Sequence, residues 1–215
     1  MHKNERISTI HEGVTMIAVI DISGNNLTSL GNALKSLDYS YILTHDAKEI
    51  AKASHVILPG VGAATYGMQA LREHGLDKLL GNLTQPILGI CLGMQLLLEY
   101  SEEGGVDCLG LIPGAARLLP KKEYYPVPHM GWNQLKWCKN TPLQQRLDSA
   151  DYVYFVHSYA LDKNQYTVAS CDYSDEFSAI INKDNIFGMQ FHPEKSAETG
   201  LILLNNFLSL ESTLC

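Results

Sequence analysis

One segment, Ile87 to Leu98, constrains the fold of this chain more than any other. Four apolar residues typical of a buried strand lead directly into a cysteine, and a helical pattern follows without a gap. Glycines stand two positions before and two positions after this cysteine, where a Cβ atom would collide with neighbouring backbone. This is the pattern of a nucleophile elbow, which projects one side chain from the end of a sheet. Because the start of a helix also favours a thiolate over a thiol, the pattern presents Cys91 as a nucleophile. A buried structural cysteine is the alternative interpretation.

A second segment, Phe187 to Ser196, supplies the groups that a thiol nucleophile requires. It has the pattern of a short strand that ends in a histidine and a carboxylate two residues apart, His192 and Glu194. Thiol catalysis needs a base, an acid for the leaving group and a third group that fixes the imidazole tautomer. Pro193 restricts its own φ and favours an extended His192, which narrows the relative positions of the two side chains. The alternative is a surface turn in which a histidine and a glutamate occur by chance.

A third segment, His55 to Ala63, is an apolar strand that runs into a Pro-Gly-x-Gly turn before a helical stretch. Glycines allow the backbone to direct N–H groups toward a developing oxyanion, which is among the larger electrostatic contributions to acyl transfer. An ordinary turn between a strand and a helix has the same pattern. The turn therefore supports the first two segments and proves nothing alone.

Short strand-like runs alternate with helical patterns in the first half of the chain. We expect strands at Met16 to Ile20, His55 to Leu58 and Ile87 to Ile90, and helices at Leu27 to Ser36, Thr65 to Leu80 and Met94 to Glu102. This alternation predicts βαβ units and a parallel sheet, whose sites lie at the carboxyl ends of the strands. From Arg117 to Ile186 the sequence is rich in Tyr, Val and turn residues, which predicts antiparallel strands. We therefore expect an α/β fold with a mixed, mainly parallel sheet flanked by helices.

Length and composition favour one domain. The 215 residues, 46% of them hydrophobic and 18% charged, are enough for one substantial core. We expect that domain at 16–215 and a flexible, polar tail at 1–15. The apolar run from Val14 to Ile20 lacks a cleavage pattern, so it is expected to be the first strand and not a signal peptide. No apolar run of the sequence is long enough to span a bilayer.

Charge and cysteine content narrow the choice of partner and compartment. A formal charge of -7 argues against nucleic acid or an anionic membrane as a partner, because both require a basic face. The five cysteines are Cys91, Cys108, Cys138, Cys171 and Cys215. They form no C-x-x-C pair, which predicts a reducing, cytoplasmic compartment. His192-x-Glu194 resembles half of a zinc deaminase signature, but no Pro-Cys-x-x-Cys follows and no H-E-x-x-H pair occurs. We expect neither a metal nor a cofactor.

Three motifs, in their order and spacing, resemble those of the class I, or triad, glutamine amidotransferases. They are Pro-Gly-Val-Gly at 59–62, Gly-Ile-Cys-Leu-Gly-Met-Gln at 89–95 and His-Pro-Glu-Lys-Ser at 192–196. Two further stretches, Pro-His-Met-Gly-Trp-Asn at 128–133 and Tyr-Phe-Val-His-Ser-Tyr at 154–159, are similar to the glutaminase subunits of imidazole glycerol phosphate synthase. The loop after the first strand also resembles that family, with Ser23 and Asn25 as departures from its usual pattern. The resemblance implies a single-domain class I glutamine amidotransferase-like fold with a nucleophile elbow.

The resemblance implies a role for each matching residue. Cys91 is the nucleophile, His192 first the general acid and then the base, and Glu194 the group that orients the imidazole. Oxyanion contacts are implied for Val61, Gly62 and Leu92, and contacts with glutamine for Gly60, Gln95, Glu103, Tyr154, His157, Ser158 and Tyr159. Positions that face the partner subunit are matched by Asn26, Trp132, Asn133 and Lys195. Apart from the resemblance, His157 could be a core histidine and Trp132 a packing residue.

The implied activity is hydrolysis of glutamine to glutamate and ammonia. By the same resemblance, ammonia passes to a (β/α)8 cyclase subunit in a one-to-one heterodimer of histidine biosynthesis. Ammonium has no lone pair with which to attack, so a docked partner must receive ammonia before it is protonated. The chain has neither a phosphate-binding Gly-rich loop with Lys and Ser/Thr nor a dinucleotide fingerprint. The chemistry on the nucleotide is therefore assigned to the partner.

Three other functions are considered. A glutaminase subunit of a paralogous amidotransferase, for example in surface-sugar biosynthesis, would carry the same motifs. A free-standing cysteine hydrolase on the same elbow, such as a peptidase or a γ-glutamyl hydrolase, would act on peptides without a partner. A catalytically silent regulatory subunit is disfavoured, because all three residues of the triad are present.

Overall fold

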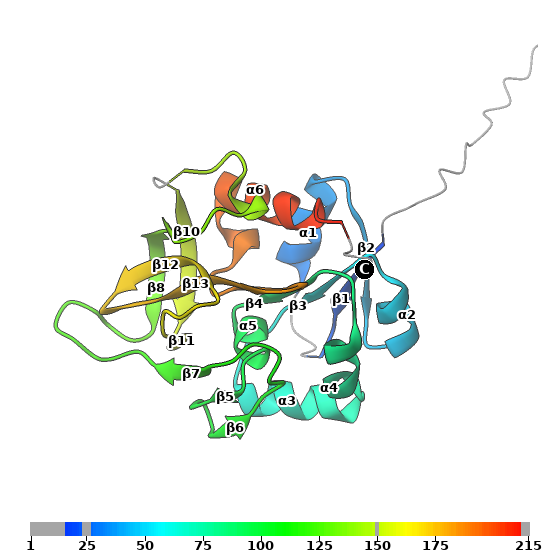
Figure 1. Cartoon of the computed structure of the whole chain (residues 1–215), viewed down its shortest axis with the longest axis horizontal. Helices are drawn as coiled ribbons and strands as arrows, with labels where there is room; N and C mark the ends of the chain where they lie inside the picture. The colour runs from blue at the N-terminus through cyan, green and yellow to red at the C-terminus, as the bar shows by residue number, and fades with distance from the viewer. Residues whose placement is uncertain (1–15, 23–26, 149–150, 212–215) are drawn as a thin grey trace, which may run out of the picture.

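An eight-stranded sheet lies at the centre of the computed structural model, which describes residues 16–22, 27–148 and 151–211 (Figure 1). Its strands are β1 (Met16–Ile20), β2 (Ser40–Thr44), β3 (His55–Leu58), β4 (Ile87–Ile90), β9 (Lys136–Trp137), β12 (Thr167–Tyr173), β13 (Asp175–Lys183) and β14 (Ile186–Met189). They lie in the order β2-β1-β3-β4-β14-β13-β12-β9. The strands from β2 to β14 pair in parallel, and those from β14 to β9 pair antiparallel. The predicted α/β fold with a mixed, mainly parallel sheet is confirmed.

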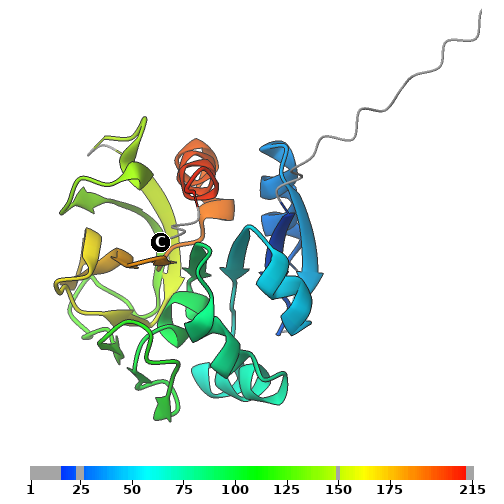
Figure 2. The ribbon, with the colours of Figure 1, turned by 45° about the vertical axis from the view of Figure 1, so that its right-hand side comes forward.

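Helices cover both faces of this sheet. They are α1 (Thr28–Ser36), α2 (Ala47–Lys52), α3 (Ala64–Glu73), α4 (Leu76–Leu79), α5 (Leu92–Leu96) and α6 (Ala197–Leu208), with three short 3-10 helices, η1 (Leu80–Asn82), η2 (Pro142–Gln144) and η3 (Pro193–Lys195). Side chains of β1 alternate between two buried apolar clusters. Ile17 and Val19 belong to the cluster that includes α1 and α6, whereas Ala18 and Ile20 pack with α2, α3 and α4. Figure 2 shows α6 (orange to red) on one side of the sheet and α3 (cyan) on the other. Strands buried on both faces need no polar side, which explains their continuous apolar runs.

Two smaller sheets extend the second half of the fold. One contains β5 (Tyr100–Ser101), β6 (Val106–Asp107), β7 (Ala115–Leu118) and β11 (Tyr159–Leu161). The other is an antiparallel ribbon of β8 (His129–Gln134) and β10 (Tyr152–His157). Side chains of the ribbon alternate between two rows. The outer row contains Met130, Trp132, Gln134, Tyr152, Tyr154 and Val156, and the inner row contains His129, Gly131, Asn133, Val153, Phe155 and His157. The inner row contributes to the core, whereas the outer row includes three exposed apolar side chains.

The predicted strands of the first half have the observed bounds of β1, β3 and β4. Two predicted helices are too long. The stretch from Thr65 to Leu80 breaks because Gly75 adopts a left-handed conformation (φ 66°), which separates α3 from α4. The stretch from Met94 to Glu102 is helical only to Leu96, since the residues of β5 pair with β6 and β7. Neither β2 nor α2 was predicted.

Some sequence predictions fall outside the described residues. These are the flexible tail at 1–15 and the loop residues Ser23, Asn25 and Asn26. Among the residues that are described, no helix is both long and apolar enough to cross a membrane.

Candidate active site

Cys91 occupies the sharp corner between β4 and α5. Its backbone angles, φ 52° and ψ −109°, lie outside the regions that L-residues favour, as expected of a strained elbow. A Cβ atom on Gly93 would overlap the carbonyl oxygen of Leu58 on β3, and one on Gly89 would lie 2.7 Å from the backbone of Gly93. The two glycines therefore allow α5 to pack against the sheet at a distance that no other residue permits, and this packing fixes the corner.

His192 and Glu194 follow β14, the strand beside β4, and so reach the same edge of the sheet as Cys91. The Nδ1 atom of His192 lies 2.8 Å from Oε1 of Glu194, and the two side chains are only 6% and 10% exposed. Because a carboxylate accepts hydrogen bonds, Nδ1 carries a hydrogen and Nε2 is the nitrogen left for the thiol. His192 and Cys91 line the same cavity, and Cys91 is one of the groups that raise the pKa of His192. The structure therefore brings the three residues of the predicted triad together.

Opposing influences set the charge of His192. Burial, the largest of them, lowers its pKa, whereas the hydrogen bonds and charges of Cys91 and Glu194 raise it. Together the raising influences prevail and bring the pKa of His192 from 6.5 to about 9. His192 is consequently protonated at neutral pH. A protonated imidazole stabilises an anionic sulfur beside it and can give a proton to a leaving group.

A cavity of about 320 Å³ lies beside the thiol. Its volume is at the lower end of the range for small-molecule sites. Ten residues predicted for the site line it: Val61, Gly62, Cys91, Leu92, Gln95, Glu103, His157, Ser158, Tyr159 and His192. Pro128 and Val156 also line the cavity, although neither was predicted.

Two side chains that line the cavity, Gln95 and Glu103, offer it hydrogen-bond acceptors. The Nε2 group of Gln95 donates to Tyr159 O at 2.9 Å and to Gln190 Oε1 at 3.1 Å. These contacts use both of its N–H bonds and leave Oε1 for the cavity. Glu103 Oε2 accepts from the backbone N–H of Ala64, the first residue of α3, at 3.0 Å. A carboxylate and an amide oxygen together suit the ammonium group of a small ligand.

Backbone N–H groups lie on two elements beside the thiol. Leu92 begins α5, and the first N–H groups of a helix have no partner within the helix. The Pro-Gly-Val-Gly turn follows β3, with Val61 49% exposed and Gly62 at φ 92°. The absence of a Cβ atom at Gly60 allows this turn to lie against the elbow, because a Cβ there would lie 2.9 Å from the backbone nitrogen of Gly93. The arrangement can supply oxyanion donors, and the oxyanion role of these residues stays a prediction.

The other predicted residues lie around the cavity and do not line it. Tyr154 accepts a hydrogen bond from His192 N through its carbonyl oxygen at 3.0 Å, and its ring centroid lies 5.9 Å from that of Trp132. Trp132 is 53% exposed in the outer row. Asn133 belongs to the inner row, so it faces away from Trp132. Lys195 is exposed and lines a second cavity of about 260 Å³ next to the triad.

Two buried residues that hold the site were not predicted. Ser196 Oγ donates to His192 O at 2.7 Å and accepts from Tyr154 N at 2.9 Å, which ties the segment after β14 to β10. Gln190 Nε2 lies 3.9 Å from Cys91 Sγ. Ser196 ends the His-Pro-Glu-Lys-Ser motif and Gln190 stands two residues before His192, but no sequence signal indicated what either side chain contacts.

The other described thiols differ from Cys91 in their surroundings. Burial raises the pKa of Cys108 to about 11 and that of Cys171 to about 12, so both are neutral thiols at neutral pH. Cys138 is exposed and lies outside the cavity. Within 16–22, 27–148 and 151–211, no group of three or more His, Cys, Asp or Glu side chains is arranged to hold a metal ion.

Comparisons with known proteins find similarity over nearly the whole chain. The family model Glutamine amidotransferase class-I matches residues 18–210. Imidazole glycerol phosphate synthase subunit HisH 2 of Legionella pneumophila (strain Paris) is 66% identical over 198 residues, which are 92% of this chain and 100% of that protein. Subunit HisH of Idiomarina loihiensis is 49% identical over 93% of this chain and 99% of its own length. Among solved structures, a Thermoplasma acidophilum protein described as a subunit of GMP synthase aligns with a TM-score of 0.70 at 19% identity, covering 92% of this chain and 94% of that one. The last similarity concerns the fold alone.

Proposed function

The chain belongs to the class I glutamine amidotransferases and, within them, to the HisH subunits of imidazole glycerol phosphate synthase, and on this basis we propose how its site works. As a member of that family it is a glutaminase of histidine biosynthesis. The proposal depends above all on one observation. Cys91 stands at a strained elbow and lines a cavity together with His192, whose Nδ1 atom lies 2.8 Å from Oε1 of Glu194.

In the first half-reaction, Sγ of Cys91 attacks the side-chain carbonyl carbon of glutamine. The negative charge that develops on the carbonyl oxygen is met by N–H groups of the Pro-Gly-Val-Gly turn and of the start of α5. As the carbon–nitrogen bond breaks, protonated His192 gives its proton to the leaving nitrogen, which departs as ammonia. A glutamyl thioester remains on Cys91. Gln95 Oε1 and the Glu103 carboxylate would accept hydrogen bonds from the α-ammonium group of the substrate.

In the second half-reaction, His192 acts as a base. Its neutral Nε2 takes a proton from a water molecule whose oxygen attacks the thioester carbon. The carbon–sulfur bond then breaks, glutamate leaves, and the anionic sulfur of Cys91 is again beside a protonated imidazole. Glu194 stays ionised and keeps the imidazole oriented throughout both steps.

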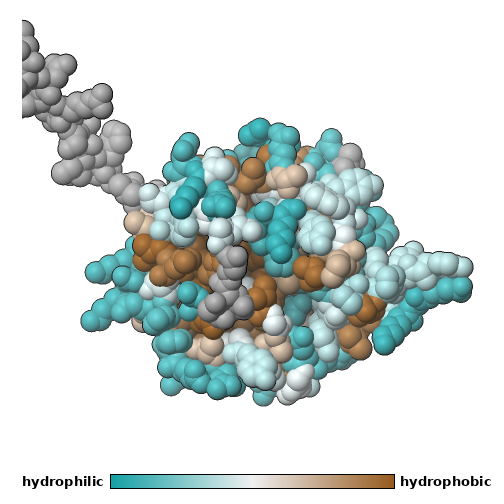
Figure 3. Space-filling view, turned by 180° about the vertical axis from the view of Figure 1, so that it is seen from behind, coloured by the Kyte–Doolittle hydropathy of each residue, from teal (hydrophilic) through white to brown (hydrophobic). Residues whose placement is uncertain are grey.

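We infer that the partner, a (β/α)8 cyclase subunit, docks on the outer row. Three apolar side chains of this row, Met130, Trp132 and Tyr152, are 62%, 53% and 52% exposed. Clustered exposed apolar side chains are typical of interaction sites. Tyr154, in the same row, contacts the backbone of His192, so a protein bound there would be close to the source of ammonia. Figure 3 shows further hydrophobic side chains gathered near the middle of one face, with hydrophilic ones around them.

The test is glutamate release from glutamine by the purified chain, first alone and then with a cognate cyclase subunit plus its nucleotide ligand. We expect slow release alone and a large increase in the complex. Cys91→Ala should abolish release, and Cys138→Ala, which alters an exposed thiol outside the cavity, should leave it unchanged. Retention of a tenth of the wild-type rate by Cys91→Ala would disprove the nucleophile.

Equal rates with and without the cyclase would mean that the partner does not activate this glutaminase. A cytoplasmic location remains a prediction, drawn from the scattered cysteines.

A further inference from the structure

A pair of buried histidines lies at the wall of the cavity, where His157 lines the cavity and His129 lies behind it. His129 on β8 and His157 on β10 are 3% and 5% exposed, and His129 Nδ1 lies 3.1 Å from His157 Nε2. The ring of His129 stacks on Phe155 and Tyr173, with centroid distances of 4.7 and 3.8 Å. Burial lowers the pKa of His129 to about 4 and that of His157 to about 3, so both rings are neutral at neutral pH. The mechanism uses neither ring for proton transfer.

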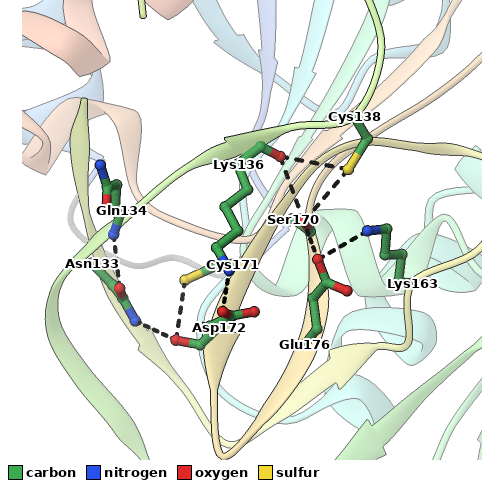
Figure 4. A network of polar contacts seen from close by, with 9 residues as sticks. All are labelled: Asn133, Gln134, Lys136, Cys138, Lys163, Ser170, Cys171, Asp172 and Glu176. Carbon is green, nitrogen blue, oxygen red and sulfur yellow. Dashed lines mark hydrogen bonds and ion pairs between the residues drawn. The ribbon is translucent and has the colours of Figure 1, made fainter. Parts of the chain in front are cut away.

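The neighbours of the pair decide which nitrogen of each neutral ring carries the hydrogen. His157 Nδ1 lies 2.9 Å from the carbonyl oxygen of Tyr159, which can only accept, so Nδ1 carries the hydrogen and Nε2 accepts. The facing Nδ1 of His129 must therefore donate, which leaves its own Nε2 as an acceptor. Asn133 Nδ2 lies 3.5 Å from this Nε2, and it also donates to Asp172 O at 2.9 Å (Figure 4). The donors therefore all point in one direction, from Asn133 to Tyr159.

This chain of hydrogen bonds ends at a group that shapes the cavity. Tyr159 O accepts from His157 and also from Nε2 of Gln95, in both cases at 2.9 Å. The second contact helps to leave Gln95 Oε1 for the cavity. If His157 carried its hydrogen on Nε2, its Nδ1 lone pair would face the lone pairs of Tyr159 O. Tyr159 O, which lies at the cavity wall and accepts from Gln95, would then lose its hydrogen bond from His157.

We propose that His129 is a positioning residue for the substrate: by donating to His157 Nε2 it stabilises and orients the imidazole whose Nδ1–H holds Tyr159 O and, through it, Gln95. His129 itself does not line the cavity. The effect on glutamine binding rests on the proposed function, whereas the assignment of the tautomers follows from the contacts alone.

The first test is nuclear magnetic resonance of the chain with ¹⁵N-labelled histidines, read near neutral pH. We expect both His129 and His157 to carry the hydrogen on Nδ1 only. His55 provides an internal reference of the opposite kind, because its Nε2 lies 3.0 Å from Leu210 O and must be the donor. In His129→Phe, His157 should keep its hydrogen on Nδ1, because Tyr159 O still accepts it, while the resonance of Nε2 should shift because this nitrogen has lost its donor.

The second test compares two substitutions in the complex with the cognate cyclase subunit. His129→Phe keeps a flat ring for stacking but removes the donor, whereas His129→Asn keeps an N–H near the former Nδ1 but loses the ring. The Phe variant should raise KM for glutamine about five- to ten-fold, as expected for one lost hydrogen bond, and change kcat less than about two-fold. The Asn variant should stay within about two-fold of the wild-type KM. His55→Phe, a buried histidine outside the cavity, should leave KM unchanged.

The outcomes separate positioning from packing. A role in packing alone predicts the reverse order, with the Asn variant more damaging than the Phe variant. That order, or a wild-type His157 with its hydrogen on Nε2 or on both nitrogens, would overturn the proposal. If the Phe variant does not fold, the wild-type tautomers and the Asn variant still decide the matter. If the complex has no glutaminase activity, the proposed function fails, but the tautomers measured in the chain alone are unaffected.

Discussion

The charge of His192 controls the chemistry at the scale of single residues. Because Cys91 and Glu194 raise its pKa to about 9 against the effect of burial, the proton needed by the leaving ammonia is present at neutral pH and lost above pH 9. We expect glutaminase activity to fall above about pH 9. In Glu194→Gln, which keeps an oxygen near Oε1 but removes the charge, this alkaline limit should move down by about one pH unit. A pH profile of kcat/KM for both proteins measures the shift, and an unchanged limit would mean that Glu194 does not set the charge of His192.

The same proton also contributes to stability. A histidine whose folded pKa lies above its unfolded value of 6.5 stabilises the fold fully below about pH 6.5, and this contribution disappears as the pH rises through about 9. The difference in unfolding free energy between wild type and Glu194→Gln should therefore be larger at pH 6 than at pH 9.5. We expect the difference to change by about 1–2 kcal/mol, measured by urea unfolding at both pH values. A difference that grows with pH would contradict the assigned sign.

Sequence reasoning at this scale succeeds where chemistry is encoded locally. Cys91 is marked by its flanking glycines, and His192 and Glu194 are two residues apart, so each could be recognised without knowledge of the fold. The role of His129 depends on His157, which is 28 residues away and becomes its neighbour only when β8 pairs with β10. No local sequence pattern predicts this contact. The direction of its hydrogen bond depends on the position of the Tyr159 carbonyl oxygen, which cannot be inferred from the sequence.

At the scale of elements, the link between η3 and β10 keeps His192 in place. Ser196 is fully buried, and its hydroxyl group joins His192 O to Tyr154 N. Ser196→Ala would leave a buried N–H without its acceptor, so we expect a loss of about 1–3 kcal/mol in unfolding free energy, together with reduced activity. Ser209→Ala, which removes an exposed hydroxyl bonded to Asn205 O just after α6, is the matched control and should cost much less. Equal effects of the two substitutions in urea unfolding would argue against the link.

The elements also show why sequence prediction was uneven. Strands buried on both faces were predicted with correct bounds, because continuous apolar runs leave little choice of register. Helix ends were not, since the end of α3 depends on the single left-handed residue Gly75 and the end of α5 on pairing of β5 with distant strands. The edge strand β2 is only partly buried, so its mixed pattern did not distinguish it from a loop.

At the scale of the whole molecule, the β8–β10 ribbon and the edge strand β2 lie on opposite sides of the fold (Figure 1). Trp132 projects from the ribbon with about half of its surface exposed, and its neighbour Tyr154 contacts His192. Large aromatic side chains at the centre of an interface commonly contribute about 2 kcal/mol or more to binding. Trp132→Ala should therefore weaken the affinity for the cognate cyclase by about 30-fold, measured by titration calorimetry.

Trp132→Ala should have little effect on the unfolding free energy of the isolated chain, because an exposed side chain buries little surface on folding. Leu43→Ala on β2, where Leu43 is similarly exposed at 50%, should change neither affinity nor activity and serves as the control. If Trp132→Ala binds the cyclase as tightly as wild type does, the partner docks elsewhere, and ammonia must leave the site away from the β8–β10 ribbon. If instead affinity falls and the glutaminase activity of the saturated complex persists, Trp132 anchors the partner without taking part in activation.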